Sequence, residues 1–226
     1  MPGPIGESRR AELAALCEPL RAELDAAHVA RERGLSACRR TIRSCSSAIR
    51  AVHRGEADNA DRLVAEASQS LREAQEALGP HPRVAHAGFL HDAEKEYAEA
   101  RLTAALVDGR PLPGPDEVDV GLAAWLCGLA EAGSELRRHL LDLIRAGDLE
   151  GGEHLLHVME DVYDLLVTVD YPDALTGGLR RATDSLRAVL ERSRADVTST
   201  VIQSRLQAAL ERRLPPGEHA GGGPVA

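Results

Sequence analysis

The chain has 226 residues and a formal net charge of −9, which argues against a general binder of polyanions. It is 43% hydrophobic but only 2% aromatic, so Leu, Ala, Val and Ile must build its core. Ala and Leu lose little conformational freedom in a helix. No segment shows the two-residue alternation of a strand flanked by turn residues. The composition therefore predicts an all-α protein.

The ends of the chain differ in composition from its body. We expect residues 1–7 to form a flexible leader, residues 8–213 a single all-helical domain, and the Gly/Pro-rich residues 214–226 a disordered tail. The N-terminus lacks the basic and apolar segments of a signal peptide, and no apolar run is long enough to span a membrane. None of the 4 cysteines forms a C-x-x-C pair, so we expect reduced thiols in a cytoplasmic protein that contacts no membrane.

Turn and breaker residues divide the chain into successive helical regions. The first begins near Ser8, is kinked or restarted at Pro19, and ends at Gly55. The next three cover about residues 58–78, 83–107 and 116–145, the fifth ends near residue 169, and the last runs to about residue 213 and could break at 177–178.

The first helical region combines an apolar stripe with a row of basic residues. Apolar residues recur three or four apart from Leu35 to Val52, which predicts packing against a partner helix. The row beside this stripe consists of Arg39, Arg40, Arg43, Arg50 and Arg54. Such a row suits the phosphates of a nucleic acid. With few aromatic residues, contact would be mainly to the backbone and weakly sequence-specific. Salt bridges to acidic neighbours are the alternative.

The region 83–107 carries an acidic stripe immediately beside its core face. Asp92, Glu96 and Glu99 form this stripe at spacings of four and three residues. Glu96 lies at the edge of the core face, so we expect it to be partly buried. A partly buried carboxylate needs a hydrogen-bond partner or a metal. The alternative is a salt-bridged surface, for which Lys95 and Arg101 are available.

The region 116–145 carries a second acidic pair. Glu131 and Glu135 are four residues apart and project together, away from the apolar face. The small residues Ala124 and Gly128 on the same side would let another element come close. A solvated surface is the alternative. If the two acidic stripes pack together, the four glutamates among them suit a hard cation, Mg²⁺ or Mn²⁺, which could activate water beside a phosphate.

Several short motifs resemble the translin/TRAX family, in which TRAX is the translin-associated factor X. Residues 95–100 (KEYAEA) and 128–136 (GLAEAGSEL) resemble segments of TRAX. Residues 146–148 (AGD) correspond to a turn found in both translin and TRAX, and residues 42–54 are similar to the family's first-helix signature. Together, in this order and spacing, they cover most of residues 30–210.

The resemblance implies a bundle of about seven helices, long and antiparallel, in a hollow homo-oligomer, typically an octamer. The family encloses single-stranded RNA or DNA, and TRAX is a Mg²⁺-dependent endoribonuclease. Its catalytic and metal-binding acids carry over onto Glu96, Glu99 and Glu131, with Glu135 as a neighbour. Position 131 departs from TRAX, which has Asp there. The family's nucleic-acid-binding residues carry over only loosely, onto the arginine row.

Two alternatives to the nuclease stay open. The first is an assembly that binds single-stranded RNA or DNA without cleaving it. The second is a ferritin-like carboxylate site, which usually needs a Glu-x-x-His pair on each of two helices. Neither acidic helix has such a pair at these positions.

Overall fold

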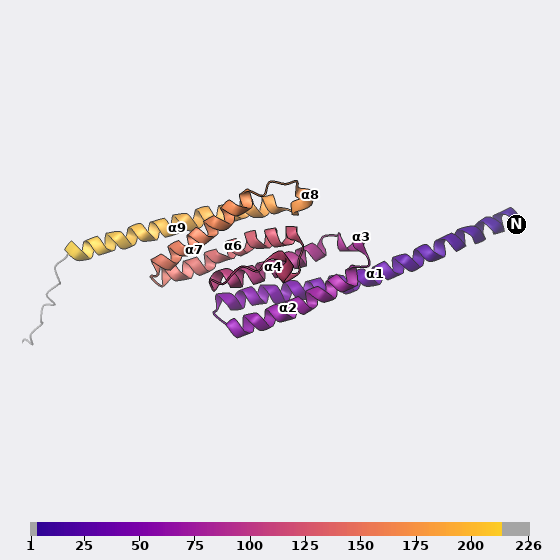
Figure 1. Cartoon of the computed structure of the whole chain (residues 1–226), viewed down its shortest axis with the longest axis horizontal. Coiled ribbons are helices and arrows are strands. Elements are labelled where there is room, and N and C mark those ends of the chain that lie inside the picture. Colours follow the sequence, from indigo (N-terminus) through magenta and orange to yellow (C-terminus); the bar gives the residue numbers. More distant parts are fainter. Residues whose placement is uncertain (1–3, 214–226) are drawn as a thin grey trace, which may run out of the picture.

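The structure, a computed structural model, describes residues 4–213. Within this range the chain forms helices and no strand, so the predicted all-α class is confirmed. The six long helices are α1 (Pro4–His53), α2 (Ala57–Leu78), α4 (Phe89–Val107), α6 (Leu122–Arg145), α7 (Leu149–Val167) and α9 (Leu179–Arg213). They run roughly along the long axis of an elongated bundle (Figure 1). No described helix is long and apolar enough to cross a membrane.

Three single-turn helices raise the number of helical segments in the described range to nine, above the seven or so expected. These are α3 (Pro82–Ala85), α5 (Pro115–Val118) and α8 (Asp173–Thr176). Each is cut off from the next long helix by a residue in a left-handed conformation, which ends a right-handed helix. The break residues are Gly88 (φ 98°), Asp119 (φ 54°) and Gly177 (φ 58°). The predicted break at 177–178 is confirmed, whereas the breaks inside 83–107 and 116–145 were missed.

Helix α1 is longer and more continuous than predicted. It begins at Pro4 and passes through Pro19, so the second start at that residue is wrong. Proline removes one backbone donor, and a helix of 50 residues keeps its other hydrogen bonds. Residues 1–3 of the predicted leader and the predicted tail 214–226 lie outside the described residues.

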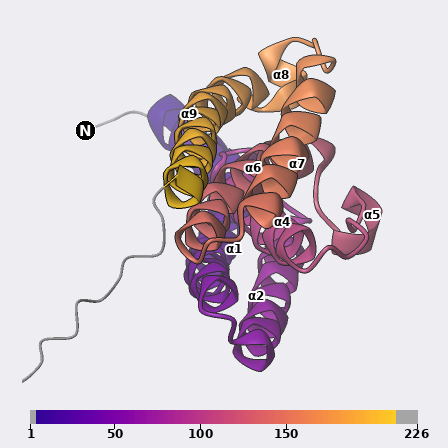
Figure 2. The same ribbon diagram turned by 90° about the vertical axis from the view of Figure 1, so that its left-hand side faces the viewer.

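The helices stack in three layers, seen end-on in Figure 2. Helices α1 and α2 form the first layer and bury Cys38, Cys45 and Leu71 against Tyr97 of α4. The middle layer is the pair α4 and α6, and the third is α7 with α9. The predicted apolar stripe from Leu35 to Val52 therefore faces α2 and α4. Helix α6 lies at the centre because it contacts α4, α7 and α9.

Candidate metal centre

The closest approach of α4 and α6 is made possible by Gly128. A Cβ atom at this position would lie 2.9 Å from both the backbone nitrogen of Glu99 and the carbonyl oxygen of Lys95. Only glycine fits such a contact without displacing backbone. Glu131 stands about one turn further along α6 and is thereby brought beside Glu96 and Glu99. The predicted role of small residues on this face is confirmed.

Three of the predicted acids converge between these two helices. Glu96, Glu99 and Glu131 each offer one carboxylate oxygen, and the three oxygens lie within 4.8 Å of one another. Glu99 is buried, with 8% of its surface exposed, while Glu96 and Glu131 are half-buried. Ligands of an octahedral Mg²⁺ at about 2.1 Å stand about 3–4 Å apart. Small side-chain rotations would bring the three oxygens to that spacing, so the residues fit a hard divalent cation.

Burial and mutual repulsion disfavour the charge on these carboxylates. The pKa of Glu99 is raised to about 9, first by burial and then by the neighbouring charges of Glu131, Glu96 and Glu135. The pKa of Glu96 is raised as well, mainly by burial and partly offset by Lys95. A divalent cation would reverse this preference, since it stabilises the ionised form.

Lys95 occupies the mouth of the cluster. Its Nζ lies 2.7 Å from Oε1 of Glu131 and 3.9 Å from a carboxylate oxygen of Glu96. Burial by itself would lower the pKa of the ammonium, but the hydrogen bond to Glu131 and the nearby carboxylates raise it. Lys95 is thus the salt-bridge partner that the alternative interpretation required. Arg101 is not, because it donates to the hydroxyl of Tyr97 at 3.2 Å.

Glu135 stands apart from the other three acids and has a partner of its own. Its Oε2 accepts a hydrogen bond of 2.7 Å from Nε2 of His53, in the last turn of α1. The His53 side chain is 2% exposed, and its Nδ1 is buried without a hydrogen-bond partner among the described residues. Spacing in the sequence did not indicate this histidine, which is 82 positions from Glu135. The only sequence signal was its place inside the first-helix motif at residues 42–54.

The arginine row on α1 divides in the structure. Arg50 lines a cavity of about 600 Å³ together with His53 and all four acids, and Arg138 of α6 lies on the same cavity. Two other members are paired with acids, as the salt-bridge alternative held: Arg40 with Glu73 at 2.5 Å, and Arg54 with Glu56 at 2.5 Å.

Arg39 and Arg43 are exposed on α1, on the N-terminal side of Arg50. They do not line the acidic cavity, and Arg43 borders a separate cavity between α1 and α2. Of the predicted row, therefore, only Arg50 is brought to the candidate metal centre.

Comparison with known proteins gives both sequence and structural relatives. No protein-family model matches the chain. The uncharacterized protein MJ0175 of Methanocaldococcus jannaschii is 27% identical over 184 residues, which are 80% of this chain and 81% of that protein. The crystal structure of AfC3PO is 28% identical with a TM-score of 0.75, and covers 83% of this chain and 97% of its own.

Two further solved structures identify the family. Apo-NeC3PO, 17% identical, covers 81% of this chain with a TM-score of 0.74, which shows a shared fold. AfC3PO in complex with duplex RNA is 30% identical with a TM-score of 0.67, over 83% of this chain and 97% of that one. With that identity sustained over nearly the whole of a solved relative, the chain belongs to the translin-like family of C3PO proteins.

Proposed function

We propose that the chain is a TRAX-like, Mg²⁺- or Mn²⁺-dependent endoribonuclease. It would hydrolyse phosphodiester bonds of single-stranded RNA inside a hollow homo-oligomer, an octamer by resemblance to the family. The observation that carries the proposal is the convergence of Glu96, Glu99 and Glu131 from two different helices. Three carboxylates around one point, one of them buried, are costly unless a cation or a proton neutralises them.

RNA as the substrate class is supported by a relative and by the charges around the cavity. AfC3PO, 30% identical in that structure, has been solved in complex with duplex RNA. In the present chain Arg50 and Arg138 border the cavity that contains the acids. A phosphodiester bound there could accept hydrogen bonds from these guanidinium groups on its non-bridging oxygens.

Each residue of the centre has a part in this proposal. A divalent cation bound here would lower the pKa of a bound water and polarise the phosphate. Glu96, Glu99 and Glu131 would hold that cation. Lys95 keeps Glu131 in place through its 2.7 Å contact and supplies positive charge at the mouth of the centre. Glu135, which accepts a hydrogen bond from His53, is the fourth acid that lines the cavity.

Substitution of Glu131 tests the proposal directly. We expect Glu131→Ala to lower cleavage of labelled single-stranded RNA in Mg²⁺ or Mn²⁺ by at least about 100-fold, as removal of a group that stabilises the transition state does. Glu153→Ala is the matched control, since this glutamate is exposed on α7 and should leave the rate unchanged. Equal rates for Glu131→Ala and the wild type would remove this residue from catalysis.

A second candidate is an RNA-binding assembly without turnover. The observation in its favour is the ion pair between Lys95 and Glu131, which already neutralises one carboxylate without a metal. This candidate predicts RNA binding that weakens with salt and no cleavage with either cation. Titration of RNA-free protein with Mn²⁺, followed by electron paramagnetic resonance, separates the two, because a pure binder has no need of a tight cation site.

A further inference from the structure

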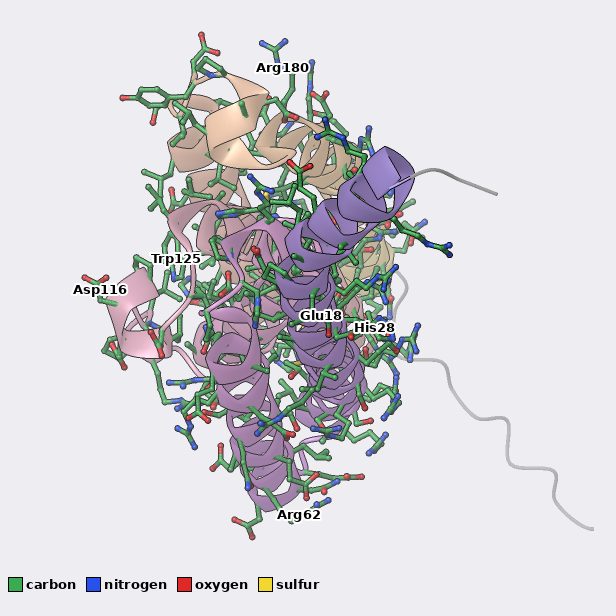
Figure 3. All side chains as sticks on the ribbon, turned by 90° about the vertical axis from the view of Figure 1, so that its right-hand side faces the viewer. Glu18, His28, Arg62, Asp116, Trp125 and Arg180 are labelled. Carbon is green, nitrogen blue, oxygen red and sulfur yellow. The ribbon has the colours of Figure 1, made fainter. Side chains whose placement is uncertain are left out.

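The first half of α1 projects from the bundle with one apolar face uncovered. Residues 9–26 are all exposed, and the helix leaves the body of the molecule over this stretch (Figures 1 and 3). Leu13, Leu16, Leu20 and Leu24 recur on one side of it and are 54–70% exposed. A single helix of this length is marginally stable in water. An apolar stripe along it therefore indicates a surface that another helix covers.

The last turns of α9 carry a matching stripe at the opposite end of the molecule. Ile202, Leu206 and Leu210 are 52–60% exposed and are spaced four residues apart. Leu16, Leu20 and Leu24 on α1 have the same spacing. The two projecting ends lie at opposite ends of the long axis in Figure 1, and both lie on the left-hand side of the end-on view in Figure 2. One neighbouring molecule on that side could reach both.

The charges beside the two stripes are complementary. On a helical wheel, Glu12 and Glu23 fall on one side of the α1 stripe, with Arg10 and Arg21 on the other. The corresponding side of the α9 stripe carries Arg205 and Arg212, and its other side carries Gln203 and Gln207.

Flanking charges set the orientation of paired helices. When two helices pack antiparallel, the flanks that lie on the same side of the stripe on the helical wheel face each other. The acidic flank of α1 therefore meets the basic flank of α9. The two acidic residues would then be shared between two arginines. In a parallel pair the same acids would face the glutamines, so the charges favour the antiparallel arrangement.

We propose that the projecting half of α1 docks antiparallel on the end of α9 from a second copy of this chain. The register that aligns the stripes pairs Leu16 with Leu210, Leu20 with Leu206, and Leu24 with Ile202. In this register Glu12 stands within two residues, about 3 Å along the axis, of Arg212. Glu23 stands at the same offset from Arg205, so both ion pairs form in one register.

The directions of α1 and α9 allow the same contact to form twice in a symmetric dimer. Within one molecule α1 and α9 run in the same direction along the long axis (Figure 1). A partner related by a two-fold axis across the bundle presents its α9 antiparallel to α1. Its own α1 then meets the α9 of the first molecule, so the same contact forms twice and both stripes of each copy are covered. A partner shifted along the axis without rotation would instead give a parallel, open-ended chain.

Disulfide trapping distinguishes these arrangements. The background is Cys17→Ser, which removes the exposed thiol; the other three cysteines are buried. In this background we expect the pair Leu16→Cys and Leu210→Cys to give a covalent dimer on mild oxidation, reversed by dithiothreitol. The matched control, Leu16→Cys with Ile202→Cys, places the thiols about 12 Å apart along the axis of an antiparallel pair and should stay uncross-linked.

Three results would overturn the proposal. Cross-linking of the Ile202 pair in preference to the Leu210 pair would show a parallel contact. A covalent dimer from Leu16→Cys alone would show that α1 pairs with α1 of another copy. No covalent dimer from either pair, in protein whose circular dichroism matches the wild type, would show that these stripes do not meet.

A charge exchange provides an independent measurement. We expect Arg205→Glu with Arg212→Glu to raise the dissociation constant of the cross-link-free assembly at least about tenfold in sedimentation equilibrium. Adding Glu12→Arg with Glu23→Arg should restore it, because the ion pairs re-form with reversed sign. Failure of this rescue would contradict the antiparallel register. The proposal does not depend on nuclease activity, and none of these variants touches the acidic centre.

Discussion

Burial makes Glu99 the acid of the centre whose charge is least favoured. Its pKa is raised from an ordinary 4.5 to about 9, first by burial and then by the charges of Glu131, Glu96 and Glu135. Between these two values the folded protein keeps a proton that the unfolded chain has lost. The stability that this proton contributes is complete below pH 4.5 and is lost as the pH rises towards about 9.

This linkage predicts a pH dependence that Glu99→Gln removes. In EDTA, the free energy of unfolding of the wild type should fall by up to about 1.4 kcal/mol per pH unit between about pH 5.5 and 8 because of Glu99. The neutral amide of the variant cannot release a proton, so its slope should be shallower by about that amount. Urea denaturation at several pH values measures both slopes, and equal slopes would contradict the raised pKa.

Among individual residues, the sequence predicted the carboxylates but not their partners. The spacing within each helix placed Glu96 beside Glu99 and Glu131 beside Glu135, and the match to known motifs gave these acids a metal-binding role. Lys95 was considered only as a salt-bridge partner that would compete with a metal. In the structure its ammonium group lies near the carboxylates of both Glu131 and Glu96. The contact of His53 with Glu135 links helices α1 and α6. Spacing along one helix cannot predict it, since it depends on how α1 lies across α6.

At the scale of elements, the contact between α4 and α6 decides whether the acids meet. Gly128 leaves no room for a side chain, because an added Cβ would also lie 2.8 Å from the Cβ of Ala98. Small residues on this face were predicted to admit a neighbouring helix, and α4 is that helix. The distance between the two backbones therefore sets the distance between Glu131 and the pair on α4.

Gly128→Ala tests this contact because two effects oppose each other. Alanine has a better helix propensity than glycine by about 1 kcal/mol, whereas overpacking of a close contact costs about 1–3 kcal/mol. We expect a net loss of about 1 kcal/mol in urea denaturation, together with a larger loss of RNA cleavage as Glu131 moves from Glu96. A more stable variant would mean that the helices do not touch at Gly128.

The helix boundaries show where local patterns were insufficient. The pattern over 116–145 predicts one continuous helical region, but within it Val118 is 3% exposed and Leu122 is 65% exposed. Asp119 adopts a left-handed conformation between them, so α5 and α6 are not one helix. The aspartate sits inside an otherwise regular apolar pattern, and periodicity alone did not reveal the turn. The breaks marked by Gly-Gly or by several prolines were easier to predict.

On the scale of the whole molecule, the acidic centre lies between the two helices of the middle layer and beside the first layer. Its ligands come from α4 and α6, and His53 of α1 contacts Glu135. A cation bound at this place would add a connection between the two helices that carry the three carboxyl groups. Binding to the folded state alone raises stability by mass action.

Addition of a divalent cation should therefore stabilise the wild type and not the Glu131→Ala variant. At a free Mn²⁺ concentration about 100 times its dissociation constant, the free energy of unfolding should rise by about 2.7 kcal/mol. Thermal denaturation with and without Mn²⁺ measures this rise, and sodium chloride at matched ionic strength serves as a control for screening. The same shift in the variant would place the cation elsewhere in the protein.

The general shape of the molecule was partly predictable. Composition and periodicity gave six long helical regions in the right order, and the resemblance to the family gave their bundle. What the sequence did not show is that residues 9–26 of α1 are all exposed. Their leucines have the spacing of a packed helix, which is the same whether the partner belongs to the same chain or to another molecule.

The continuity of α1 has a mechanical consequence. This helix spans 50 residues, about 75 Å if straight, and its two halves face different surroundings. The inner half is clamped between α2 and α4 and ends at His53, beside the acidic centre. The outer half projects from the bundle, and its direction is set by the packing of the inner half. A second copy docked on the outer half, as proposed above, would therefore be oriented by the same helix that ends beside the acidic centre. The angle between the two copies would then depend on how the inner half of α1 packs.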